Sequence, residues 1–177
     1  MRSLVLALAL TLPLPAFSAG SDTMTPPTPS DTTKTCKGKR VWDEAKGRCV
    51  RPKQSSLDQD GLYDAVRELA YAGRNEDAQA VLTAMSDQGD TRVLTYWGFT
   101  HRKLGNSALA KAFYDQAIAQ DPDNLLARSY MAQGFVEEGQ FGLALAEWKE
   151  IRARGGVGTW PETSLRHALE TGVTTSY

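Results

Sequence analysis

The sequence predicts an all-α protein in which helix-turn-helix units stack as a solenoid behind a small cysteine-clipped hairpin. The first observation is a repeated pattern, because Ala78, Ala110 and Ala144 each follow a glycine by five residues and precede a bulky apolar residue by four. The second is the spacing of these alanines, thirty-two and then thirty-four residues, which is typical of helical repeats. The third is the pair of cysteines upstream of the repeats. In stacked helical arrays function lies in the exposed surface, so we expect a binding task.

Residues 1–18 have the pattern of a Sec-type secretory signal peptide. Met1-Arg2 supplies a positive start, and Leu4 to Leu12 is an apolar stretch of roughly half the length that a membrane-spanning helix needs. We expect cleavage after Ser18, with Ala19 as the alternative; an uncleaved anchor is the rival interpretation. No cysteine stands at the cleavage site, which argues against a lipoprotein. The sequence therefore predicts an exported protein, periplasmic or, alternatively, secreted.

Residues 19–35 predict a disordered linker. The stretch from Gly20 to Thr35 consists mainly of Ser, Thr, Asp and Pro. Such a composition buries too little apolar surface to offset the entropy of ordering. We expect a flexible, partly polyproline-like tether between the signal peptide and the cysteines.

Residues 36–50 predict a disulfide-clipped hairpin. Two cysteines in an exported chain, Cys36 and Cys49, indicate a disulfide, and no His or acidic ligands stand at a spacing that would make a metal site. Val41-Trp42 reads as a short strand that Asp43 to Gly47 turns back. On the chain-entropy model, closing so short a loop contributes at most about 3 kcal/mol. This stretch resembles a small cysteine-clipped module found in exported proteins of Gram-negative bacteria.

Charge is distributed unevenly along the chain. Residues 34–53 hold eight basic and two acidic side chains, a net charge of +6, whereas the chain from Gln54 onward carries −6. One interpretation is attachment to anionic lipid headgroups or cell-wall polymers, with Trp42 as a stacking or interfacial side chain. The alternatives are a solvated basic face or one lying against the acidic helices of the same molecule; nucleic acid is not expected, since interleaved aromatics are missing. The candidate basic site comprises Lys37, Lys39, Arg40, Trp42, Lys46 and Arg48.

The second repeat unit contains a recurring set of large, small and aromatic residues that ends in a proline: Leu94, Trp97-Gly98, His101, Gly105, Ala110, Tyr114, Ala117 and Pro122. This pattern resembles that of the tetratricopeptide repeat family, and the resemblance covers about Gln59 to Arg154. The second unit matches best, whereas the third has Arg128 at the first large position and Gly156 in place of the closing proline. The resemblance implies three helix pairs within a helical domain spanning 57–172.

Local signals place the ends of the helices. Gly73, Gly105 and Gly139 suit the left-handed residue that ends a helix. Small residues such as Gly98 allow two helices to approach closely. A last amphipathic helix opens at Pro161 and runs to about Glu170, and we expect it to cap the open end of the stack.

The resemblance implies a concave groove, lined by the first helix of each unit, that binds a peptide or protein segment. We expect Phe99, flanked by Arg67 and Arg102, to combine apolar contact with carboxylate recognition. The alternative is that Phe99 is a buried packing residue beside snorkelling arginines. This face has no asparagines like those that clamp a C-terminal carboxylate in one variant of the family, so that specificity is not implied. The candidate groove residues are Tyr63, Arg67, Arg92, Thr95, Phe99, Arg102 and Gln133.

The sequence gives no sign of catalysis. His101 occupies an aromatic position of the repeat and His167 lies on the last helix, and neither has an acidic or nucleophilic partner at a recognisable spacing. Metalloprotease, nucleophile-elbow, phosphate-loop and dinucleotide motifs do not occur. We therefore expect a non-catalytic adaptor or scaffold without cofactor or metal. A self-assembling structural subunit is the remaining alternative.

Overall fold

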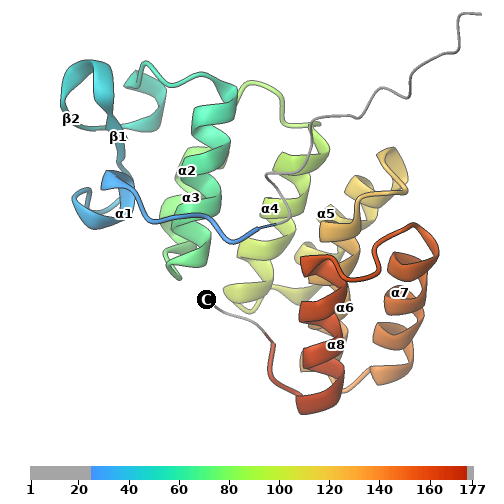
Figure 1. Cartoon of the computed structure of the whole chain (residues 1–177). Helices are drawn as coiled ribbons and strands as arrows, with labels where there is room; N and C mark the ends of the chain where they lie inside the picture. Colours follow the sequence, from blue (N-terminus) through green and yellow to red (C-terminus); the bar gives the residue numbers. More distant parts are fainter. Residues whose placement is uncertain (1–24, 175–177) are drawn as a thin grey trace, which may run out of the picture.

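The computed structural model describes residues 25–174. The predicted signal peptide and the first residues of the predicted linker lie outside this range. The described chain is mostly helical: a small N-terminal hairpin is followed by three pairs of consecutive helices and a last helix (Figure 1). Within this range no helix has the length and apolar character that crossing a bilayer would require.

The predicted disulfide hairpin is confirmed. Strand β1 (Val41–Asp43) pairs antiparallel with β2 (Arg48–Val50), and the 3₁₀ turn η2 (Glu44–Lys46) joins them. Cys36 and Cys49 form a disulfide. Gly47 closes the turn with φ +58°, a left-handed conformation that glycine adopts without strain. A second 3₁₀ turn, η3 (Pro52–Gln54), leads from the hairpin toward the helices.

Three helix pairs follow, each joined by a short turn. The predicted helix breaks are confirmed, because Gly73, Gly105 and Gly139 have φ of +74°, +82° and +74°. In all three turns the backbone N–H of the glycine donates to a carbonyl in the last turn of the preceding helix, as is typical of helices that end in a left-handed residue. The pairs are α2 (Gln59–Tyr71) with α3 (Asn75–Leu82), α4 (Thr91–Lys103) with α5 (Ser107–Gln120), and α6 (Leu125–Glu137) with α7 (Phe141–Ala153).

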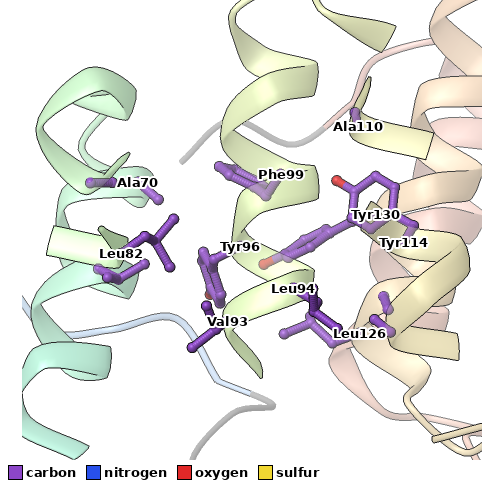
Figure 2. Close-up of a cluster of buried hydrophobic side chains, with 14 of the residues drawn as sticks. Ala70, Leu82, Val93, Leu94, Tyr96, Phe99, Ala110, Tyr114, Leu126 and Tyr130 are labelled. Atoms are coloured by element: carbon purple, nitrogen blue, oxygen red, sulfur yellow. The ribbon is translucent and has the colours of Figure 1, made fainter. Parts of the chain in front are cut away.

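Aromatic side chains fill the core between the pairs. Tyr96 and Phe99 of α4 lie between α2 and α6, and Figure 2 shows both pointing into the buried cluster. Tyr114 of α5 packs against Gly98 so closely that a Cβ added there would lie 2.5 Å from its ring. The small residues expected at close helix contacts are buried, as Ala78 and Ala144 are both 0% exposed.

The last helix, α8 (Trp160–Thr171), lies against α6 and α7, where the sequence placed a capping helix. The Ser129 hydroxyl donates to the Pro161 carbonyl at 2.8 Å. The Trp148 indole donates to the buried Glu162 carboxylate at 3.0 Å. Gly172 ends the helix with φ +74°, also as expected. These contacts cover the C-terminal end of the helical array.

The N-terminal end is covered by a segment that the sequence predicted to be disordered. Ser30 caps a short helix, α1 (Asp31–Lys34), and this segment binds the buried Glu68 carboxylate of α2. Ser30 donates to Glu68 through its backbone N–H and its hydroxyl, both at 2.6 Å, and Thr33 donates through its N–H at 3.1 Å and through its hydroxyl. The prediction of a disordered linker was therefore wrong for residues 30–34. Hydrogen bonds to the distant Glu68 carboxylate order this segment, although its composition alone favours disorder.

Replacing Glu68 by alanine is expected to release this segment. The two backbone N–H groups and two hydroxyls would lose a charged acceptor, and hydrogen bonds to charged groups contribute about 1.5–3 kcal/mol. We expect amide exchange at residues 30–35 to accelerate at least about tenfold while α4 to α7 keep their protection, as native-state hydrogen exchange would report. Glu68→Gln is the matched control and should accelerate exchange less. Unchanged exchange in the alanine variant would contradict the proposed anchoring.

Candidate functional site

Most of the predicted groove residues are buried. Tyr63, Thr95, Phe99 and Gln133 are each at most 4% exposed, and Arg67 and Arg102 are 5% and 6% exposed. Arg92 is the exception, with 38% of its side chain exposed. The face that the resemblance assigned to a ligand is therefore mainly packing surface in this protein.

Phe99 shows why the face is closed. Its ring lies 6.3 Å from that of Tyr71 on α2 and 4.7 Å from that of Tyr130 on α6. The hydroxyls of Tyr71 and Tyr130 are 2.8 Å apart, so a hydrogen bond joins α2 to α6 across α4. Phe99 lies within this aromatic cluster and is 1% exposed. The expectation of an exposed Phe99 is corrected, and the buried packing role is the one the structure supports.

The arginines of this face have partners inside the protein. Arg67 donates to the Thr25 carbonyl at 2.5 Å, and Arg102 pairs with Glu137 at 2.5 Å. Arg92 pairs with Asp60 and Asp90, both at 2.9 Å, and its guanidinium lies 4.9 Å from the centre of the Tyr63 ring. Arg102 does lie near Phe99, 5.6 Å from its ring centre, but Arg67 lies over Tyr63 instead. Of the two arginines predicted to flank Phe99, only Arg102 therefore lies beside its ring.

The hairpin carries a basic surface that, unlike the predicted groove, is exposed. A groove of about 880 Å³ is lined by five exposed basic side chains together with Gly38, Pro52, Gln54 and Ala80. No acidic side chain lines it in the described part of the chain. We call it the basic groove; its cations are Lys37, Lys39, Arg40, Arg51 and Lys53.

The cations of the basic groove have no internal ion pairs. Among residues 25–174, ten of the eleven basic residues after Gln54 form an ion pair, whereas Lys46 alone does so among the eight from Lys34 to Lys53. The hairpin therefore does not lie with its charges against the acidic helices, which was one of the sequence-based alternatives. Its positive charge faces solvent and is free to act on an external anion.

Two sets of hydrogen bonds hold the basic groove on the helical array. Arg74, at the start of α3, donates to the carbonyls of Cys36 and Gly38, both at 2.9 Å. The Asp43 carboxylate, 0% exposed, accepts from the Ser56 hydroxyl and N–H, both at 2.7 Å. The hydrogen bonds from Ser56 and Lys46 hold the pKa of Asp43 well below its usual range, so it remains an ionised acceptor. The cations are thereby displayed on a fixed frame.

The structure gathers only half of the predicted basic site. Lys37, Lys39 and Arg40 line the groove. Lys46 instead pairs with Asp43 at 3.1 Å, and Arg48 is exposed outside the groove. Trp42 lines a separate cavity of about 650 Å³ between residues 25–34 and α2. The predicted site residues therefore do not form a single surface.

Sequence reasoning left Arg51 and Lys53 out of the site, although both line the basic groove. They follow the second strand and were counted only in the charge of residues 34–53. Pro52 between them, at the start of η3, was the available signal, because proline favours the first turn of such a helix and so bends the chain there.

The histidines occupy ordinary structural environments. His101 packs against Trp97 and Phe113, with ring centres 5.7 Å and 5.6 Å away, and burial lowers its pKa. His167 is exposed on α8. In residues 25–174 no group of three or more His, Cys, Asp or Glu side chains is placed to hold a metal ion.

Comparison with known proteins adds no identification: no family model, no curated protein and no solved structure matches the chain.

Proposed function

We propose that this protein is a non-catalytic binding protein that docks on anionic material of the cell envelope through the basic groove. The observation that carries the proposal is the set of five exposed cations around one groove, none of them in an ion pair within residues 25–174. Displayed cations without internal partners attract anionic surfaces, whereas paired ones are largely neutralised. The anionic group that suits them is a repeated phosphate or carboxylate, as on lipid headgroups or cell-wall polymers.

The helical array serves as the scaffold in this proposal. We infer that its helix pairs are tetratricopeptide-like units, capped by α8 at one end and by α1 and the hairpin at the other. Solenoids need such caps because an open terminal unit exposes apolar surface. The location belongs to the same proposal: export by residues 1–18 into the periplasm is supported by the disulfide, which is typical of an oxidising compartment.

A peptide bound along the first helices is the less supported function. Six of the seven predicted groove residues are buried, so such a ligand would have to separate Tyr71 from Tyr130 before reaching Phe99. The basic groove needs no such opening. We therefore place the primary binding role on the hairpin.

Neutralising three of the five cations of the basic groove is expected to weaken envelope binding strongly. The variant Lys37→Gln/Lys39→Gln/Arg40→Gln removes three cations that contribute about 1 kcal/mol each near an anionic membrane. We expect at least about a tenfold loss of affinity in cosedimentation with phosphatidylglycerol vesicles and with isolated cell-wall sacculi, in about 0.15 M salt. Binding to only one of the two materials would identify the source of the anion.

The matched control is Lys111→Gln/Lys149→Gln/Arg166→Gln, which changes the net charge equally but on the helices. We expect this control to bind nearly as well as the unaltered protein. Equal losses in both triple variants would show that only net charge matters. A complete lack of binding by the unaltered protein would reject the proposal.

A further inference from the structure

A cavity of about 320 Å³ lies between α4, α5 and α6, away from the hairpin. Its apolar wall includes Ala108 and Ala110 of α5 and Met131 and Phe135 of α6. Arg102 also lines it. Gly134 makes room for this arginine, since a Cβ at that position would lie 3.1 Å from Arg102 Cδ.

The guanidinium of Arg102 is only partly used by the protein. Its Nη1 donates to Glu137 at 2.5 Å, and 2% of the side chain is exposed. Its Nε and Nη2 are buried and have no carboxylate or carbonyl acceptor among residues 25–174, and the guanidinium lies beside the Tyr114 hydroxyl. These two nitrogens form one edge of the planar group, the edge that binds both oxygens of a carboxylate at once. Arg102 therefore uses Nη1 to bind Glu137, whereas its Nε–Nη2 edge, which we call the free fork, has no carboxylate acceptor among residues 25–174.

A third unused donor belongs to Tyr114, which lines the same cavity. Its hydroxyl is buried beside the guanidinium of Arg102 and donates its proton to no acceptor in the described part of the chain. Burial raises the pKa of Tyr114, so the hydroxyl keeps its proton and can donate it. Ser107, the first residue of α5, also lines the cavity, and Asn106 makes no side-chain cap there. The positive end of this helix therefore adds to the preference for an anion.

The net charge around the cavity is nearly balanced. Lys111 pairs with Asp115 at 2.8 Å, and Glu138 lines the cavity as well. Directional donors, rather than an excess of positive charge, therefore distinguish it from the basic groove. A single carboxylate fits this arrangement better than a highly charged polyanion, and the apolar walls favour a compact hydrocarbon body attached to it.

We propose that this cavity binds a small monocarboxylate, whose two oxygens take the free fork of Arg102 and the hydroxyl of Tyr114 while its apolar body lies against α6. The exposed lining residues mark the open side of the cavity, where the acid enters, and the unbranched side chain of buried Met131 adapts readily to a ligand; these exposed residues are Ser107, Ala108, Lys111 and Glu138. The carboxylate supplies an acceptor for three donors that otherwise have none. The inference is independent of the proposed envelope binding.

The test is calorimetric titration of the full mature protein with two acids of different origin. Hexanoate represents an alkanoic acid and N-acetyl-leucine a peptide-like carboxylate, and hexylammonium and N-acetyl-leucinamide are their respective controls without a carboxylate. We expect saturable binding of at least one acid and of neither control. Preference for one acid would identify the source of the carboxylate. No saturable binding of either acid, or equal binding of the controls, would overturn the proposal.

Three variants and one control separate this role from a structural one. Arg102→Lys keeps the charge beside Glu137 but loses the fork, and Tyr114→Phe removes only the unused hydroxyl; each should weaken acid binding roughly tenfold or more. Ala108→Leu should block the cavity, whereas Ala112→Leu, exposed one turn further along α5 and not part of the lining, should not. Helical circular dichroism should be retained in all of them. Unchanged affinity in both Tyr114→Phe and Ala108→Leu would also overturn the proposal.

Discussion

Replacing Gly98 by alanine is expected to lower the free energy of unfolding by about 2–3 kcal/mol. The added Cβ would lie 2.5, 2.6 and 2.8 Å from three atoms of the Tyr114 ring, closer than real contacts allow. Tyr114 is 1% exposed, so its ring can move away only toward the cavity that it lines, and it loses core contacts when it does so. Alanine favours a helix by up to about 1 kcal/mol over glycine, so the loss would appear despite this gain. Urea unfolding followed by circular dichroism measures it.

Gly142→Ala provides the matched control for Gly98. Gly142 lies in α7, and a Cβ there would meet nothing within 4 Å. We expect this variant to be unchanged or more stable by about 0.5 kcal/mol, since only helix propensity acts. Adding Tyr114→Leu to Gly98→Ala should recover part of the lost stability, because the second change removes the clashing ring atoms. A Gly98→Ala variant as stable as Gly142→Ala would contradict the close approach of α4 and α5.

Removing the disulfide is expected to cost about 2–3 kcal/mol of stability. Cys36 and Cys49 are separated by 13 positions, and closing a loop of about this length removes conformational entropy from the unfolded chain. Val41 and Val50 belong to the core cluster, at 0% and 8% exposed, so loosening the hairpin also exposes apolar surface of that cluster. The Cys36→Ser/Cys49→Ser variant should therefore unfold at a lower urea concentration than the oxidised protein.

Two further measurements make the disulfide prediction specific. The unaltered protein unfolded in the presence of reductant should match the double variant, since both lack the same link. Envelope binding should also weaken in both, because Lys37, Lys39 and Arg40 lie inside the closed loop and the groove depends on its shape. A variant as stable as the oxidised protein would show that packing and the contacts of Arg74 and Asp43 hold the hairpin without the disulfide.

The position of helices followed from local sequence, because helix ends are decided by neighbouring residues. The three glycine turns, the helix pairs and the last helix ending at Gly172 agree with the structure. The same is true of the hairpin, since two cysteines and a short turn have few other ways to fold. These features depend on backbone preferences and spacing along the chain, which a single sequence contains.

The ordering of residues 30–34 could not be predicted, because its cause lies far along the chain. Glu68 is 38 residues from Ser30, and no residue near Ser30 indicates that its N–H group donates to a buried carboxylate of a distant helix. The prediction that Phe99 contacts a ligand was wrong for a related reason. Helical spacing puts Phe99 on one face of α4, but only the approach of Tyr71 and Tyr130 from two other helices decides that this face is closed.

What the sequence by itself determined is the class of protein: helix pairs, a disulfide hairpin, and a positive segment ahead of negatively charged helices. Only the tertiary structure decided which charged side chains lack an internal ion-pair partner. It pairs most basic residues of the helices with acids, leaves the five around the basic groove facing solvent, and buries Arg102 with an unused edge. The physical reason is that helix formation and charge content are local properties, whereas burial and pairing depend on how separate segments meet in space.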